Sequence, residues 1–227
     1  MTPRILDLRA EAPAKRARSR VAGGRTVLRD PRDVDGITLH QTAVVFGARA
    51  SHKKRAAAEG APELAPAYRV AEDVPAHAVA LDGVVVLGAP LRQYLYHANA
   101  LNRSTLGLEI EGRYPGLVDD PNTVADEAKR TMWGDVSKQT ELTGARVAAA
   151  AEALRLLVSL GQAEGMRIRY VYAHRQASGS RRSDPGAALW RALRPVWLSL
   201  GLVERPTWTR DDGRPLPAGW GPYEGRY

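Results

Sequence analysis

Two side chains of metal-binding type flank one loop of this sequence. His174 follows the alternating residues 166–173, MRIRYVYA, which predict a strand, and Asp184 returns from the far side of a loop of small and basic residues. Pro185 and Gly186 come next and favour a turn that can open a helix. An imidazole and a carboxylate placed in this way can converge on one divalent cation, but zinc sites normally use three or four ligands. The rest of the chain must therefore supply another.

His40 is the candidate for that third ligand. Residues 36–43, GITLHQTA, indicate a short apolar strand that ends in histidine, so His40 and His174 would both lie at the rim of one sheet. Two neutral imidazoles and the Asp184 carboxylate leave the fourth tetrahedral position open, as in a catalytic zinc site. A lone histidine at a strand end is more often an ordinary hydrogen-bonding group, so these residues alone leave both interpretations open.

Several motifs taken together resemble one enzyme family. GITLHQTA, TLGLEIEG at residues 105–112 and AHRQASGSRRSDPG at residues 173–186 occur in the order found in the zinc-dependent N-acetylmuramoyl-L-alanine amidases, and PAHAVALDGVVV at residues 75–86 is similar to a strand–turn–strand of that family. The superfamily includes phage amidase lysozymes, muropeptide-recycling amidases and animal peptidoglycan-recognition proteins. The similarity spans residues 36–197. It implies an α/β (α+β) fold, with a single domain and a central mixed β-sheet flanked by helices.

The resemblance also implies a set of site residues. It assigns zinc to His40, His174 and Asp184, and it places the catalytic glutamate at Glu109. Glu111 is a rival, because period-two alternation puts it on the same strand face as Glu109. The family motif, and not the alternation, selects Glu109.

A second group of residues is implied around the metal. Arg182 falls where many members have a lysine that stabilises the oxyanion, although a planar guanidinium is not interchangeable with an ammonium. Arg181 is expected to face away, since neighbours in an extended loop point to opposite sides. Tyr68 is the candidate for a tyrosine that some members use in catalysis. The resemblance places four further residues at the substrate groove: His77, His97, Asn102 and Thr105. For His77, a structural role within its strand is the preferred alternative.

Composition and local patterns define the rest of the chain. The 227 residues include 44% hydrophobic residues and no cysteine, so a globular core is expected and disulfides are excluded. We expect a basic N-terminal arm at 1–33, the catalytic domain at 34–203 and an irregular C-terminal tail at 204–227. His52 lies in a basic stretch and is expected to be exposed. Further patterns predict helices near residues 49–59, 63–71, 122–132, 140–165 and 186–202, and a hairpin of residues 74–81 and 84–87. Pro195 is expected to kink or end the last of these helices.

The charge balance suggests polyanionic partners. A formal net charge of +8 favours nucleic acid or anionic wall and envelope polymers without choosing between them. Nucleic acid is the less favoured partner, because KRARSR at residues 15–20 is accompanied by no zinc finger, aromatic platform or helix–turn–helix pattern. No signal peptide or transmembrane segment is expected from the hydropathy of the sequence.

Four functions remain open, of which the least favoured is a nucleic-acid-binding protein led by the basic arm. The first is a bacteriolytic phage-type endolysin that hydrolyses the amide between N-acetylmuramic acid and L-alanine in peptidoglycan, and that reaches the wall from the host cytoplasm through a holin. The second is a cytosolic amidase that recycles muropeptides. The third is a non-catalytic peptidoglycan-binding protein, against which the presence of Asp184 and Glu109 argues.

Overall fold

One mixed sheet organises the chain. The computed structural model describes residues 2–11, 19–114, 116 and 139–222. The expected helix at 122–132 and most of the basic segment at 15–20 lie outside these residues. In the described part, the main sheet has seven strands in the order β1-β6-β5-β7-β4-β8-β9. Its strands are β1 (Arg4–Asp7), β4 (Gly36–Gln41), β5 (Ala78–Ala80), β6 (Val84–Leu87), β7 (Thr105–Ile110), β8 (Tyr170–Ala173) and β9 (Val203–Glu204).

The directions of the strands determine which strand ends lie at the same edge of the sheet. All neighbouring pairs in this sheet are parallel except β5 and β6, which form the predicted antiparallel hairpin around Asp82 and Gly83. A separate two-stranded ribbon joins β2 (Val21–Ala22) to β3 (Arg25–Thr26). The carboxyl ends of β4, β7 and β8 therefore share one edge of the sheet.

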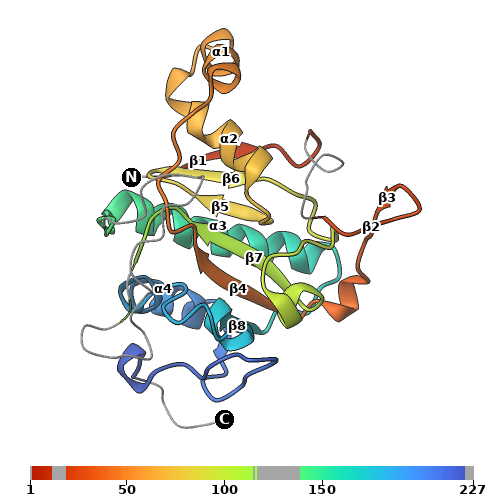
Figure 1. Cartoon of the computed structure of the whole chain (residues 1–227), viewed down its shortest axis with the longest axis vertical. Coiled ribbons are helices and arrows are strands. Elements are labelled where there is room, and N and C mark those ends of the chain that lie inside the picture. Colours follow the sequence, from red (N-terminus) through yellow and green to blue (C-terminus); the bar gives the residue numbers. More distant parts are fainter. Residues whose placement is uncertain (1, 12–18, 115, 117–138, 223–227) are drawn as a thin grey trace.

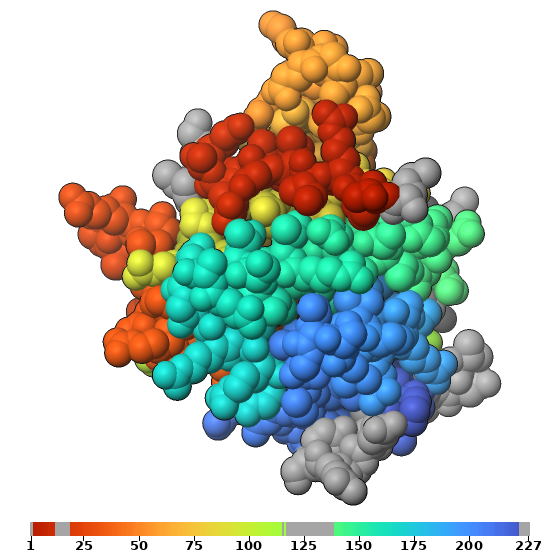
Figure 2. All heavy atoms as spheres, turned by 180° about the vertical axis from the view of Figure 1, so that it is seen from behind, coloured from red at the N-terminus to blue at the C-terminus, as the bar shows by residue number. Residues whose placement is uncertain are grey.

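Helices cover both faces of the sheet. The α3 helix (Gly144–Ala163) and the α4 helix (Ala187–Ser199) lie side by side on one face, which is the face seen from behind in Figure 2. On the other side, α2 (Ala65–Asp73) packs near β6, and α1 (Ala50–Ala58) projects beyond it (Figure 1). Short 3-10 helices connect these elements: Pro31–Asp33, Pro62–Leu64, Asn99–Asn102, His174–Ala177 and Ala218–Trp220.

The alternation in β7 explains the position of the core. Leu106, Leu108 and Ile110 are fully buried in the same cluster as α3, while Glu109 between them points to the opposite face. The α3 helix presents buried alanines to the sheet, and their small side chains allow close packing. The apolar face predicted for this strand is confirmed.

Both ends of the described chain contact the central domain. Residues 4–7 are not only part of an arm, because they form the edge strand β1. The described part of the tail folds back on the domain, where Trp220 is fully buried at 6.0 Å from the ring of Trp190. The α4 helix continues through Pro195 to Ser199 and does not end at the proline.

Within the described residues, we find no helix that combines the length and the apolar character needed to cross a bilayer.

Candidate metal centre

Strand register brings the predicted ligands to one place. His40 is the register partner of Glu109 across β4 and β7, and Leu39 is the partner of Ala173 across β4 and β8. His174 follows Ala173 directly, so it lies beside His40. Parallel neighbours place paired residues on the same face, and for these side chains it is the face opposite α3. The carboxyl edge of an open parallel sheet is also where such folds usually bind ligands.

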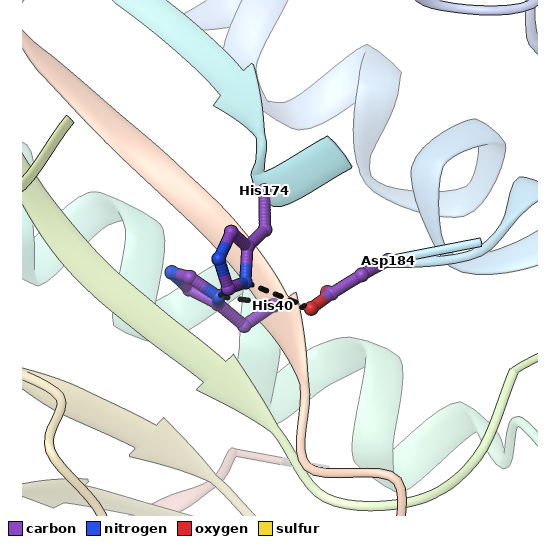
Figure 3. A group of neighbouring side chains, drawn as sticks. All are labelled: His40, His174 and Asp184. Carbon is purple, nitrogen blue, oxygen red and sulfur yellow. Dashed lines mark hydrogen bonds and ion pairs between the residues drawn. The ribbon is translucent and has the colours of Figure 1, made fainter. Parts of the chain in front are cut away.

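Three ligand atoms converge at this edge (Figure 3). The Nδ1 atoms of His40 and His174 are 3.0 Å apart, His174 Nδ1 is 3.0 Å from Asp184 Oδ2, and His40 Nδ1 is 3.9 Å from the same oxygen. A tetrahedral zinc ion with bonds of about 2.0–2.2 Å would set its ligands roughly 3.3–3.5 Å apart. The three side chains, which are all buried, therefore fit such an ion in donor type and in spacing.

The electrostatics keep His40 in the form that can bind a metal. Burial, followed by the proximity of His174, His97 and Arg181, lowers the pKa of His40 well below its usual value. A neutral imidazole has a lone pair to offer, whereas a protonated one has none. His40 therefore does not need to lose a proton at neutral pH in order to act as a ligand.

Asp184 is held in position from two sides. The backbone N–H of Gln41 donates to Asp184 Oδ1 at 2.9 Å, and the Gln41 side-chain amide donates to the carbonyls of Ser183 and Tyr114, each at 2.8 Å. Gly186, two residues after Asp184, has a φ of 103°, and a Cβ there would overlap the Tyr114 carbonyl. This close approach of the two backbones therefore requires glycine. Gln41 was not predicted from the sequence, although its position directly after His40 was an available signal.

A cavity of about 320 Å³ opens at this group. The proposed ligands His174 and Asp184 line it together with Glu109 and His97. The other lining residues are Gln41, Thr42, Ala43, Val44, Phe46, Asp73, Val74, Pro75 and Arg181. The cavity thus joins the candidate ligands to a carboxylate, a cation and an apolar wall.

The two glutamates after Leu108 have different surroundings. Glu109 is half-buried and lines the cavity. Glu111 accepts a hydrogen bond from the Phe46 backbone N–H at 2.9 Å and lies 3.6 Å from Arg146 Nη2. Burial raises the pKa of Glu111, against the lowering effect of these two partners. Glu111 is thus engaged in the packing of α3, and Glu109 is the carboxylate at the cavity.

The expectation that Arg181 faces away from the site is wrong. Arg181 lines the cavity, and Arg182 is not among its lining residues. The Arg181 N–H donates to the Ser178 carbonyl and the Asp184 N–H donates to the Arg181 carbonyl, each at 3.1 Å. Such bonds close two tight turns, residues 178–181 and 181–184, so the segment is not extended. Arg181 is the first residue of the second turn, and Asp184 is its last. Arg182 lies at its bend, where its carbonyl accepts from the Arg175 side chain.

Of the four expected groove residues, only His97 lines the cavity. The other three, His77, Asn102 and Thr105, are buried and do not line it. His97 Nδ1 lies 3.1 Å from His40 Nε2. Asn102 accepts from the His97 backbone N–H at 2.8 Å, and the Thr105 hydroxyl lies 2.7 Å from the Thr38 hydroxyl. His77 is fully buried and accepts from the Gly107 N–H at its Nδ1 atom.

Tyr68 and His52 belong to the α1–α2 region and not to the cavity. The Tyr68 hydroxyl donates to Glu59, and the Arg55 guanidinium lies over its ring. His52 is only 6% exposed, which corrects the expectation of an exposed side chain. Its Nε2 is 2.7 Å from Glu72, a residue of α2 that local composition does not reveal as a partner.

The chain matches the family model described as N-acetylmuramoyl-L-alanine amidase over residues 30–187. No curated protein matches the chain. Among solved structures, it is similar to the endolysin N-acetylmuramoyl-L-alanine amidase LysCS from Clostridium intestinale, with 14% identity, coverage of 89% of this chain and 99% of that chain, and a TM-score of 0.49.

Two further structures are similar at the same level. Drosophila PGRP-LB has 14% identity, coverage of 85% of this chain and 93% of that one, and a TM-score of 0.47. The Ph2119 endolysin from a Thermus scotoductus bacteriophage has 15% identity, coverage of 88% and 100%, and a TM-score of 0.44. The family match extends over the sheet edge that bears all three candidate ligands, and this chain belongs to the N-acetylmuramoyl-L-alanine amidase family.

Proposed function

We propose that this protein is a zinc-dependent amidase that cleaves the bond between the lactyl group of N-acetylmuramic acid and L-alanine in peptidoglycan. The observation that carries the proposal is the convergence of His40, His174 and Asp184 at a cavity that Glu109 also lines. Family membership supports the choice of scissile bond. The donor set and its spacing support zinc as the ion.

Each side chain has a role that follows from its position. His40, His174 and Asp184 would hold the zinc ion, which would supply Lewis acidity for polarising a carbonyl and for making a water molecule more acidic. Glu109 lies at the cavity wall, where it accepts a proton from the attacking water. It then returns that proton to the amine of L-alanine as the C–N bond of the amide breaks. Gln41 fixes the orientation of the Asp184 carboxylate through the backbone N–H.

Arg181 is the second electrophilic group in this proposal. It lines the cavity beside Asp184, so its guanidinium can reach a carbonyl oxygen that becomes negatively charged during the reaction. The family resemblance implied this role for Arg182 instead. Replacing each arginine separately by alanine compares the two assignments directly.

Product analysis on purified peptidoglycan tests the proposed reaction. Cleavage of the lactyl–alanine amide releases peptides with a free alanine N-terminus and leaves the glycan chains intact, both of which mass spectrometry detects. Glu109→Gln is the matched control, because it retains the shape of the side chain and removes its basicity. New reducing ends, or cleavage within the peptide, would replace the proposed reaction with another. Binding without any cleavage would favour the non-catalytic alternative.

We further propose an endolysin role, in which the excess of basic residues favours contact with anionic wall polymers. Comparison of the cleavage rates on intact sacculi and on soluble muropeptides distinguishes this role from muropeptide recycling. An endolysin degrades sacculi efficiently, and the degradation weakens as salt screens the charge. A recycling amidase prefers the soluble fragments.

A further inference from the structure

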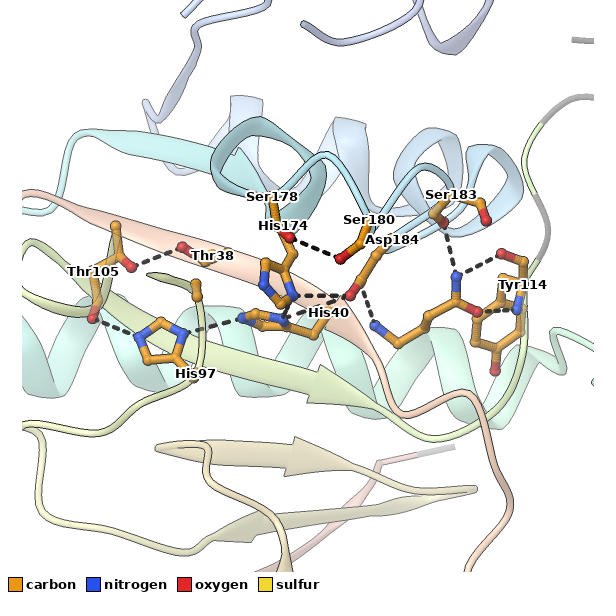
Figure 4. A network of polar contacts seen from close by, with 12 residues as sticks. Thr38, His40, His97, Thr105, Tyr114, His174, Ser178, Ser180, Ser183 and Asp184 are labelled. Atoms are coloured by element: carbon orange, nitrogen blue, oxygen red, sulfur yellow. Dashed lines mark hydrogen bonds and ion pairs between the residues drawn. The ribbon is translucent and has the colours of Figure 1, made fainter. Parts of the chain in front are cut away.

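A line of polar groups continues from the candidate ligands into the protein (Figure 4). His40 Nε2 lies 3.1 Å from His97 Nδ1, and His97 Nε2 lies 3.3 Å from the carbonyl oxygen of Thr105. Both imidazoles are buried, at 1% and 7% exposure, so water does not compete freely for these nitrogens. The direction of each hydrogen bond therefore depends on the protein alone.

The carbonyl at the inner end fixes that direction. A carbonyl oxygen only accepts, so His97 Nε2 must carry a proton and donate. The same oxygen accepts from Arg29 Nη1 at 2.5 Å, which places a cation beside His97 and favours the neutral ring. In a neutral ring with Nε2 protonated, Nδ1 is an acceptor. The His97 Nδ1 atom must then receive the proton of His40 Nε2.

The position of the His97 ring is fixed by sterics as well as by hydrogen bonds. A Cβ on Gly107 would lie 2.9 Å from both Cγ and Nδ1 of this ring, so the ring rests directly on the glycine backbone. Asn102 Oδ1 accepts from the backbone N–H groups of His97 and Ala98, at 2.8 and 2.6 Å. These contacts leave the ring little freedom to turn away from His40.

We propose that His97 is a positioning residue which selects the tautomer of His40. By accepting the proton of His40 Nε2, it leaves His40 Nδ1 without a proton, and this is the atom that faces His174 and Asp184. Outer partners of metal-binding histidines act in this way by fixing the protonated nitrogen and the ring orientation. The consequence for metal affinity rests on the proposed function, whereas the tautomer itself does not.

Two measurements on the full-length chain test the proposal. Long-range ¹⁵N–¹H correlation spectra of the chelator-treated protein report which ring nitrogen of His40 is protonated. We expect Nε2 in the wild type and a mixture of tautomers in His97→Leu. Competition with a chromophoric chelator measures the zinc Kd, which we expect to weaken about 10–100-fold in His97→Leu. An unchanged tautomer and an unchanged Kd would each overturn the proposal.

Two other variants separate tautomer selection from damage to the fold. His97→Asn keeps an acceptor near the position of Nδ1 and should retain most of the zinc affinity. Gly107→Ala keeps the imidazole but displaces its ring, and it should reproduce the mixed tautomer even if His97→Leu fails to fold. His52→Leu removes another buried histidine away from the cavity and should change neither measurement.

If Gly107→Ala preserves the wild-type tautomer, or if His97→Asn loses as much affinity as His97→Leu, the proposal fails. A wild type that shows the Nε2-protonated tautomer but binds no zinc would refute the proposed function and leave the tautomer assignment intact.

Discussion

The sheet edge and the α1–α2 region both contain buried residues of catalytic type, but they use them differently. In the α1–α2 region, His52 contacts Glu72 and the Tyr68 hydroxyl donates to Glu59, so each polar group has an acidic partner. At the sheet edge, two imidazole nitrogens and one carboxylate oxygen approach one another beside a cavity. Convergence of several electron-pair donors on one point, rather than the presence of such residues, distinguishes the candidate site.

Removal of a ligand should give the largest contrast between the two regions. Asp184→Ala deletes one of the three proposed zinc ligands, and we expect amidase activity to fall to the background level because the remaining pair of imidazoles is too few for tight binding. The release of alanine-terminated peptides measures this loss. Full activity in Asp184→Ala would exclude the carboxylate from the reaction.

Glu109→Gln should have the next largest effect. We expect a rate lower by about 10²–10⁴, with zinc content and fold retained, because the variant removes only the proton acceptor. Glu111→Gln is the control, and it should alter thermal stability more than turnover since Glu111 contacts Arg146 and the Phe46 backbone. A reversal of these two outcomes would identify Glu111 as the base.

The two loop arginines should differ by a smaller factor. Arg181→Ala removes a cation from the cavity wall, and kcat and kcat/KM should fall together by up to about 10²–10³, as for the loss of one oxyanion donor. Arg182→Ala should leave both parameters near their wild-type values. Kinetics on a soluble muropeptide avoid interference from wall binding. Loss of turnover in Arg182→Ala alone would restore the assignment made from the sequence.

Tyr68→Phe should have the smallest effect on activity. The variant removes the hydroxyl that donates to Glu59 but retains the ring beneath Arg55. We therefore expect unchanged kcat and KM and a slightly lower melting temperature. A large loss of kcat with an unchanged melting temperature would show that Tyr68 reaches the substrate during turnover.

Local sequence patterns predicted part of the sheet. Alternation in β7 predicted the buried face of Leu106, Leu108 and Ile110, and the Asp-Gly turn predicted the hairpin of β5 and β6. The family motifs identified three residues that converge in the structure. Strand periodicity and motif order carry this information because parallel neighbours bring the ends of distant segments together.

Turn geometry and contacts between distant segments account for the failures. The orientation of Arg181 depends on two tight turns, which a run of small residues does not distinguish from an extended loop. The burial of His52 depends on Glu72 from the following helix. The edge strand β1 depends on pairing with β6, which is almost eighty residues away in the chain. Such contacts have no signature in local composition.

The zinc content of the purified protein is the most direct test of the three proposed ligands. Elemental analysis of protein purified without added metal should give one zinc per wild-type chain. Asp184→Ala should retain little of it, while Tyr68→Phe should retain all of it. A wild-type protein with less than a tenth of an equivalent, and with amidase activity that a chelator does not reduce, would contradict the assignment of His40, His174 and Asp184 as the ligands of a catalytic zinc ion.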